Sequence, residues 1–111
     1  MIINIAKDFS RTPGFRYKSD GPFSGQMFRE EKLEPSFEND ENRETIKIIL
    51  DGVAGYATSF LEEAFGGLAR KFGIDKVLER LGFISDEEPL LIEEIRNYIR
   101  KCHEKKIISL Y

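Results

Sequence analysis

The chain has 111 residues, enough for one domain with its own hydrophobic core, and we expect residues 1–111 to form that single domain. Hydrophobic residues make up 41% and charged residues 33%, which excludes wholesale disorder. The net charge of -3 gives no overall field that would attract nucleic acid or an anionic membrane, so we expect neither as a partner.

The N-terminal part predicts a short hairpin. Residues 1–6 are rich in isoleucine and predict a first strand. A Thr-Pro-Gly turn follows, in which Pro13 presets one dihedral and Gly14 accepts a positive one. Residues 15–18 alternate aromatic and basic side chains and predict a second strand, antiparallel to the first.

A helix and a polar loop are expected next. Ser24 is typical of an N-cap, and the helix it predicts covers residues 25–33. Pro35 should end that helix. Residues 37–44 are polar and acidic and predict a solvated loop.

The central stretch predicts a strand, a turn and a helix. Residues 46–50 form a short apolar run, typical of a strand that is buried on both faces. Asp51 then begins a glycine-containing turn, and Ser59 with Glu62 matches a capping box, so the helix should begin at Thr58 or Ser59. The apolar stripe of this helix consists of Phe60, Leu61, Ala64, Phe65, Leu68 and Phe72.

The C-terminal part predicts two more helices. One covers residues 74–81 with Asp75 as its cap, and Gly82 stops it. Residues 83–85 predict a short strand, and the last helix covers residues 86–104 with Asp86 as its cap. Residues 107–111 are expected to add an edge strand or to dock. The expected fold class is α/β, a small mixed β-sheet packed by helices.

Gly66 and Gly67 stand in the middle of the central helix, where glycine weakens a helix. On an α-helical wheel Gly66 lies opposite the apolar stripe, beside Glu62 and Arg70. We therefore expect a smooth outer face, made by Glu62, Glu63, Gly66 and Arg70, that docks a partner; the alternative is a tolerated glycine pair.

A second candidate site lies before the Ser24 helix. Arg11, Arg16 and Lys18 flank a glycine-rich loop that ends at Ser24 and Gly25. Free N–H groups and basic side chains can bind an anion in such a place, which would suit a nucleotide- or phosphate-binding sensor. The alternative is a solvated loop, because no phosphate-binding fingerprint is present.

Catalytic and metal-binding patterns are absent from the sequence. Cys102 and His103 are adjacent on a predicted helix, so their side chains point in different directions and form no dyad. One cysteine and one histidine also make a poor metal set, and one cysteine excludes an intrachain disulfide. We expect no enzyme activity and no cofactor. With no bilayer-spanning run and no leader at Met1, we expect a cytoplasmic protein.

The segments DFSRTPGFRYKSDGPFSGQMFRE and LDGVAGYATSFLEEAFGGL, residues 8–30 and 50–68, resemble the STAS-like domain family of unknown function. This bacterial family is similar to anti-sigma-factor antagonists, in which a partner kinase-like ATPase phosphorylates the first serine of an Asp-Ser-Ser-Gly turn. The resemblance implies a regulatory protein with such a partner. It places Thr58 on the phosphorylated position and Ser59 beside it, whereas Ala57 and Phe60 depart from the pattern.

Because ligand and partner sites of α/β sheets tend to lie at the carboxyl ends of strands, we expect the turn after the central strand to contact the partner. The turn residues expected there are Asp51, Gly55 and Tyr56, next to Glu62, Glu63, Gly66 and Arg70 of the helix. The alternative is that Thr58 and Ser59 only cap the helix.

Overall fold

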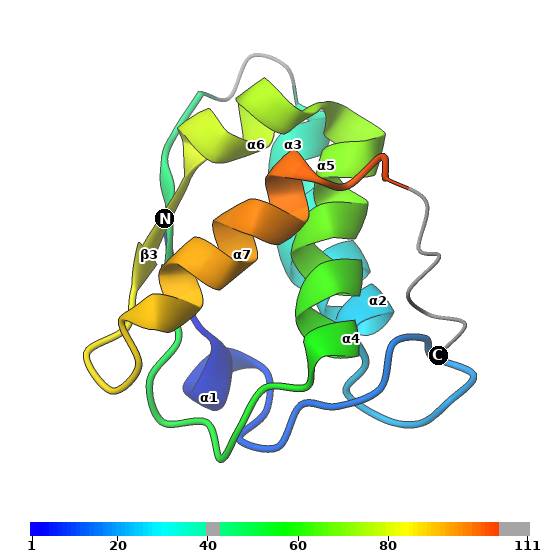
Figure 1. Cartoon of the computed structure of the whole chain (residues 1–111), viewed down its shortest axis with the longest axis vertical. Helices are drawn as coiled ribbons and strands as arrows, with labels where there is room; N and C mark the ends of the chain where they lie inside the picture. Colours follow the sequence, from blue (N-terminus) through cyan, green and yellow to red (C-terminus); the bar gives the residue numbers. More distant parts are fainter. Residues whose placement is uncertain (40–42, 105–111) are drawn as a thin grey trace.

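A sheet of three parallel strands forms one layer of the computed structural model, which describes residues 1–39 and 43–104 (Figure 1). The strands are β1 (Ile2–Asn4), β2 (Ile46–Ile49) and β3 (Leu81–Ile84), in that spatial order. Both strand pairs are parallel, so the described sheet is parallel rather than mixed. The α/β class and the central strand are confirmed, and β3 begins two residues earlier than expected.

Helices form the second layer. Two runs, α2–η1–α3 and α4–η2–α5, lie against each other, and α7 crosses the second run (Figure 1). Each run contains one π-turn, in which the helix widens by one residue. The helical elements are α1 (Ile5–Asp8), α2 (Gly25–Phe28), η1 (Arg29–Leu33), α3 (Glu34–Glu38), α4 (Thr58–Leu61), η2 (Glu62–Gly66), α5 (Gly67–Phe72), α6 (Ile74–Arg80) and α7 (Leu90–Arg100).

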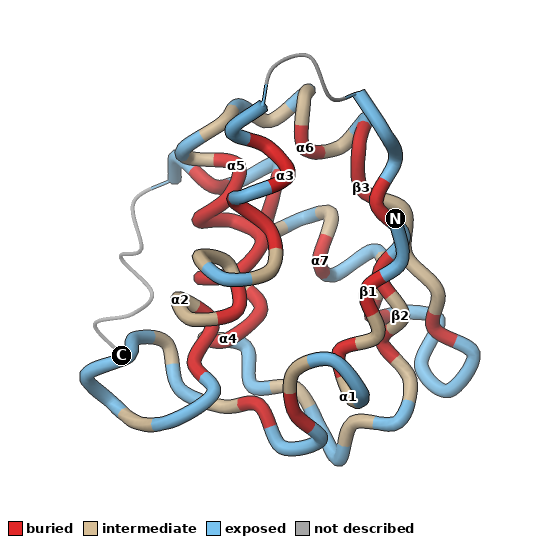
Figure 2. Tube along the Cα trace, turned by 180° about the vertical axis from the view of Figure 1, so that it is seen from behind, coloured by how far each residue is buried: buried red, intermediate tan, exposed pale blue. Residues whose placement is uncertain are grey.

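The helices cover only one face of the described sheet. Ile3 and Ile48 share a register and are buried, and Phe83, next in register, packs its ring on Phe65 of the central helix at 5.4 Å. On the other face Ile2 is 63% exposed and its register partner Lys47 is also exposed. The expectation of a strand buried on both faces is therefore wrong. Buried residues concentrate in the central helical run and on the inner face of the sheet (Figure 2).

The expected second strand at residues 15–18 is also wrong. These residues belong to an arch, which we define as residues 11–25 and which contains no regular strand. The carbonyls of Phe15 and Arg16 accept hydrogen bonds from the N–H groups of Gly25 and Gln26, both at 3.0 Å. The backbone of the arch is thus bonded to the start of α2 instead of to β1.

The Ser24 cap is confirmed, because its side chain accepts from the Met27 N–H. The helical run does not end before Pro35, which lies in the first turn of α3, where its missing N–H costs little. The π-turn η1 directly before it lets the run continue. Phe37 is consequently buried, not in a loop, and the guanidinium of Arg80 lies 4.3 Å from its ring centre. Residues 40–42 of the expected loop lie outside the described residues.

The remaining cap predictions failed. The central helix begins at Thr58 with Ala57 as N-cap and no side-chain cap bond, so the Ser59–Glu62 capping box is absent. Its apolar stripe is confirmed. The first residue of α6 follows Gly73, which has a φ of 104°, so Asp75 is not its cap.

The last helix, α7, starts after Pro89 rather than at Asp86. The hydroxyl of Ser85 accepts from the Glu88 N–H and organises the turn before it. α7 buries Leu91, Ile95 and Ile99, with Tyr98 half-buried, and Cys102 is buried just after the helix ends. Residues 107–111 lie outside the described residues.

The two helical runs approach each other closely at Gly25. A Cβ at this position would lie 2.5 Å from the Phe60 carbonyl oxygen and 3.1 Å from the Cβ of Glu63. Only glycine fits between these two backbones without displacing one of them.

We predict that Gly25→Ala lowers the free energy of unfolding by about 2 kcal/mol, because an added methyl overpacks a rigid backbone contact. Gly55→Ala is the matched control, since nothing lies within 4 Å of its Cβ position. Urea denaturation followed by circular dichroism measures both. Equal stability of the two variants would show that the helical runs can separate at little cost.

Candidate functional site

The turn from Asp51 to Ser59 follows β2 at the carboxyl end of the parallel sheet, where ligands and partners of α/β proteins usually bind. The Asp51 carboxylate accepts from the N–H groups of Asp86 and Glu87, both at 3.0 Å. In return, the Glu87 carboxylate accepts from the N–H of Gly52 at 2.9 Å. Asp51 therefore fastens the turn after β2 to the turn after β3.

Tyr56 fixes the second half of this turn. Its hydroxyl donates to the Leu50 carbonyl at 2.8 Å, and its ring packs beside that of Phe60. Burial raises the pKa of Tyr56 well above its usual range, and the carboxylates of Asp51 and Glu87 raise it further. Gly55, between these two fixed points, is exposed with open space around it.

Thr58 is exposed and is the first residue of the central helix, whose first turn has no side-chain cap. Its side chain hydrogen-bonds Tyr98 of α7, and the Tyr98 hydroxyl also donates to the Glu94 carboxylate at 3.0 Å. Burial raises the pKa of Tyr98, and the bond to Thr58 opposes that shift. Ser59 is half-buried. Thr58 thus lies where the turn, the central helix and α7 meet.

One turn further along, Glu62 and Glu63 form what we call the carboxylate pair. Arg16 of the arch lies 2.5 Å from Glu62 and 3.5 Å from Glu63. Arg70 of α5 lies 2.6 Å from Glu62 and 3.8 Å from Glu63. Arg29 of η1 forms a short ion pair with Glu63. Three arginines from three segments therefore converge on two adjacent carboxylates.

The π-turn η2 explains part of this convergence. The N–H of Gly67 donates to the carbonyls of Glu62 and Ala64 and passes over that of Glu63. The carbonyl of Glu63 accepts instead from Arg29 at 3.0 Å. The π-turn leaves the Glu63 carbonyl without a bond from the Gly67 N–H, and Arg29 of the neighbouring run supplies a hydrogen bond to that carbonyl.

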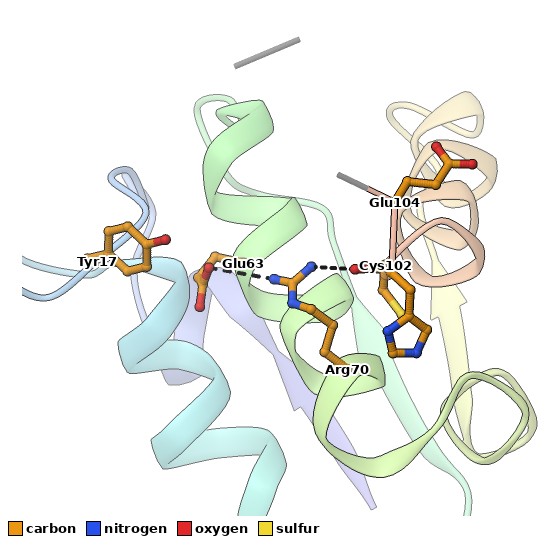
Figure 3. Close-up of a pocket in the computed structure, with 6 residues that line it drawn as sticks. Tyr17, Glu63, Arg70, Cys102 and Glu104 are labelled. Carbon is orange, nitrogen blue, oxygen red and sulfur yellow. Dashed lines mark hydrogen bonds and ion pairs between the residues drawn. The ribbon is translucent and has the colours of Figure 1, made fainter. Parts of the chain in front are cut away.

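An open cleft of about 450 Å³ lies beside the carboxylate pair (Figure 3). Arg70 reaches across it, between Glu63 and the Cys102 carbonyl, which accepts from its guanidinium at 3.1 Å. Burial raises the pKa of the Cys102 thiol, so this cysteine is a poor nucleophile. The cleft is lined by Tyr17, Glu63, Arg70, Cys102, His103 and Glu104.

The expected smooth outer face of the central helix is not present. Gly66 is buried, and a Cβ there would lie 2.7 Å from the Glu62 carboxylate and 3.3 Å from the Tyr98 carbonyl. Glu63 is buried as well. The prediction of an exposed Gly66 is wrong, because α7 packs on this side of η2. Asp51, Gly55, Tyr56 and Thr58 lie together at the turn, apart from Gly66 and Arg70.

The expected anion site also lacks its donors. The N–H groups of Gly25 and Gln26 are bonded to the arch, and the Ser24 hydroxyl accepts from Met27. Arg16 points to the carboxylate pair, and Lys18 pairs with Glu30 at 2.5 Å. The basic side chains and N–H groups therefore do not converge on a common point.

Comparison with models of protein families shows which family the chain belongs to. A family model described as a STAS-like domain of unknown function (DUF4325) matches residues 24–91, which include β2, the turn and the whole central helix. The chain belongs to this STAS-like family. No curated protein and no solved structure matches it. In the described part of this STAS-like chain, no helix combines the length and the hydrophobicity needed to cross a bilayer.

Sequence reasoning missed a second set of charges in this STAS-like domain. Glu34 is buried and bonded to Arg29 at 2.8 Å and to Lys71 at 2.7 Å. Arg29 and Glu34 are five residues apart. Side chains on an α-helix pair at a spacing of three or four residues, but the π-turn η1 brings these two side chains together. An arginine followed five residues later by a glutamate was the feature of the sequence from which this ion pair could have been predicted.

We predict that Glu63→Gln lowers the free energy of unfolding by about 2 kcal/mol, because it leaves a mostly buried arginine cluster with less counter-charge. The control is Glu93→Gln, whose carboxylate is 59% exposed and pairs with Arg100 at the surface. That variant should lose less than about 1 kcal/mol. Urea titrations at neutral pH measure both, and equal losses would mean that the carboxylate pair is no more important than a surface ion pair.

Glu34 predicts a pH dependence. Burial alone would raise the pKa of Glu34, but hydrogen bonds from Lys71 and Arg29 outweigh it, so the pKa is lowered. The unfolded chain takes up this proton first as the pH falls, so the stabilisation is present above about pH 4.3 and is lost below it. Unfolding free energies measured from about pH 6 to about pH 3 should fall less steeply in Glu34→Gln than in the wild type. An unchanged slope would contradict the assignment.

Proposed function

We propose that this STAS-like chain is a non-enzymatic regulatory module of the cytoplasm, without a cofactor, which acts by binding a protein. The partner is a kinase-like ATPase of the anti-sigma type, and neither nucleic acid nor a membrane takes part. Membership of the STAS-like family supports a regulatory role. The observation that carries the finer proposal is the exposed Thr58 at the start of the helix that follows β2.

Thr58 is the residue whose phosphorylation would switch binding. A phosphoryl group there adds about two negative charges at a helix N-terminus, where the free N–H groups of the first turn and the helix dipole favour them. The open space around Gly55 leaves the turn accessible to a large partner. Ser59, half-buried on the next position, is less accessible and is the second candidate.

The effect of phosphorylation would reach α7. The Thr58 side chain is bonded to Tyr98, which also donates to the Glu94 carboxylate. A phosphate on Thr58 would repel that carboxylate and compete for the Tyr98 hydroxyl. The partner would therefore distinguish two arrangements of the turn and the exposed side of α7, with Asp51 and Tyr56 holding the turn in place.

The test begins with purification of the tagged protein from its own host and identification of any bound ATPase. That ATPase is then incubated with the chain and radiolabelled ATP. We predict label on the wild type and on Ser59→Ala, and none on Thr58→Ala. Thr58→Glu should bind the ATPase about tenfold more weakly, in line with the usual effect of a phosphate at an interface.

Thermal denaturation of the four proteins serves as the control for folding. If no ATPase binds, or if Thr58→Ala is labelled as strongly as the wild type, the proposed switch is wrong. Equal affinities of Thr58→Ala and Thr58→Glu for the ATPase would also contradict it.

A further inference from the structure

The arch exposes three aromatic side chains. Phe15, Tyr17 and Phe23 are 47%, 45% and 39% exposed. Among the residues that the structure describes, no other phenylalanine or tyrosine is exposed. Exposed aromatic residues are rare on a soluble surface and are the residue type most enriched where proteins bind each other.

Two of these residues also have an unfavourable backbone. Phe15 has a φ of 64° and Phe23 a φ of 54°, and no other described residue except glycine has a positive φ. A bulky side chain in this region costs about 1 to 3 kcal/mol. Asparagine or glycine would fit both positions with less strain. The Phe23 ring packs on Phe9 at 5.5 Å and the Phe15 ring lies over Gly21, yet both rings remain partly exposed.

The arch is held in one conformation. The N–H of Gly14 donates to the Phe23 carbonyl at 3.2 Å, and that of Gly25 to the Phe15 carbonyl at 3.0 Å, so the two phenylalanines lie on neighbouring backbones. The Asp20 carboxylate accepts from the Tyr17 N–H, and Arg16 anchors the arch to Glu62. A pre-organised loop loses little entropy when it binds.

The charge of the arch differs from that of the rest of the chain. Arg11, Arg16 and Lys18 against Asp20 give residues 11–25 a formal charge of +2, whereas the whole chain carries -3. The Asp20 carboxylate is already bonded to backbone within the arch. Arg16 is paired with Glu62 and Lys18 with Glu30, but half of the Lys18 side chain remains exposed, and Arg11 is exposed as well. Because a surface ion pair such as Lys18–Glu30 is weak, an acidic segment can compete with Glu30 for Lys18 and can also face Arg11.

We propose that the arch is a docking element for an acidic protein segment, whose apolar side chains pack on Phe15 and Phe23 while its carboxylates face Arg11 and Lys18. A lipid bilayer is a less suitable occupant, because it does not require aromatic rings at fixed positions and would not offset the backbone strain. The inference goes beyond the proposed function: it concerns a different surface and does not depend on Thr58.

The test is a selection of random peptides displayed on phage against the immobilised full chain. Selected peptides are synthesised with a fluorophore, and their affinities are measured by fluorescence polarisation. We expect acidic peptides with one or more large apolar residues. Phe15→Asn and Phe23→Asn should weaken their binding at least about tenfold. Leu90→Asn is the matched control, since Leu90 is 86% exposed at the start of α7, and it should bind as the wild type does.

Thermal denaturation separates docking from folding. Because asparagine tolerates a positive φ, Phe15→Asn should melt no lower than the wild type while it loses peptide binding, whereas Phe23→Asn also loses its packing on Phe9 and should melt lower. Three results would overturn the proposal: no enrichment of acidic apolar peptides, equal affinity in the phenylalanine variants, or arch-dependent binding only to phosphatidylserine vesicles or to a second copy of the chain.

Discussion

The ion pairs between the carboxylate pair and three arginines determine how the parts of this domain are placed. Glu62 and Glu63 stand on a π-turn of the central helix, and the arginines come from the arch, the neighbouring helical run and α5. Through the Cys102 carbonyl, Arg70 also holds the end of α7. The sheet alone could not do this, because its described strands have three or four residues each and its helices cover one face. The position of the arch and the shape of the cleft both follow from these charges.

The turn after β2 is fixed by different contacts. Asp51 and Glu87 tie it to the turn after β3, and Tyr56 ties it to the end of β2. Gly55, between these points, and Thr58, just after Tyr56, remain exposed. The arch and the turn are linked by a backbone hydrogen bond from the Ala54 N–H to the Arg11 carbonyl, so the two proposed binding surfaces are neighbours.

Sequence patterns correctly predicted those features of the fold that depend on residues close together in the sequence. The apolar run of β2, the stripe of the central helix and the Ser24 cap each follow from a few adjacent positions, and each is present. Gly66 lies beside Glu62 as the α-helical wheel predicts, but it was expected to be exposed because a wheel does not record that α7 packs on this side of η2, which is a non-local contact. The arch was misread as a strand and as an anion site because its carbonyls bond to the start of α2, a non-local pairing that no sequence pattern records.

Buried ion pairs of this kind are weak evidence for stability, since apolar residues of similar volume often stabilise a fold as well or better. Their value lies in geometry. Some of these guanidinium groups bond two carboxylates, or a carboxylate and a carbonyl. Such a group can bond its partners in few positions, whereas apolar side chains tolerate small displacements of one element against another. Arg16, bonded to Glu62, is the side chain that fixes the arch on the central helix, and two strained phenylalanines belong to that arch. The charged interior therefore serves to present exposed aromatic residues at fixed positions.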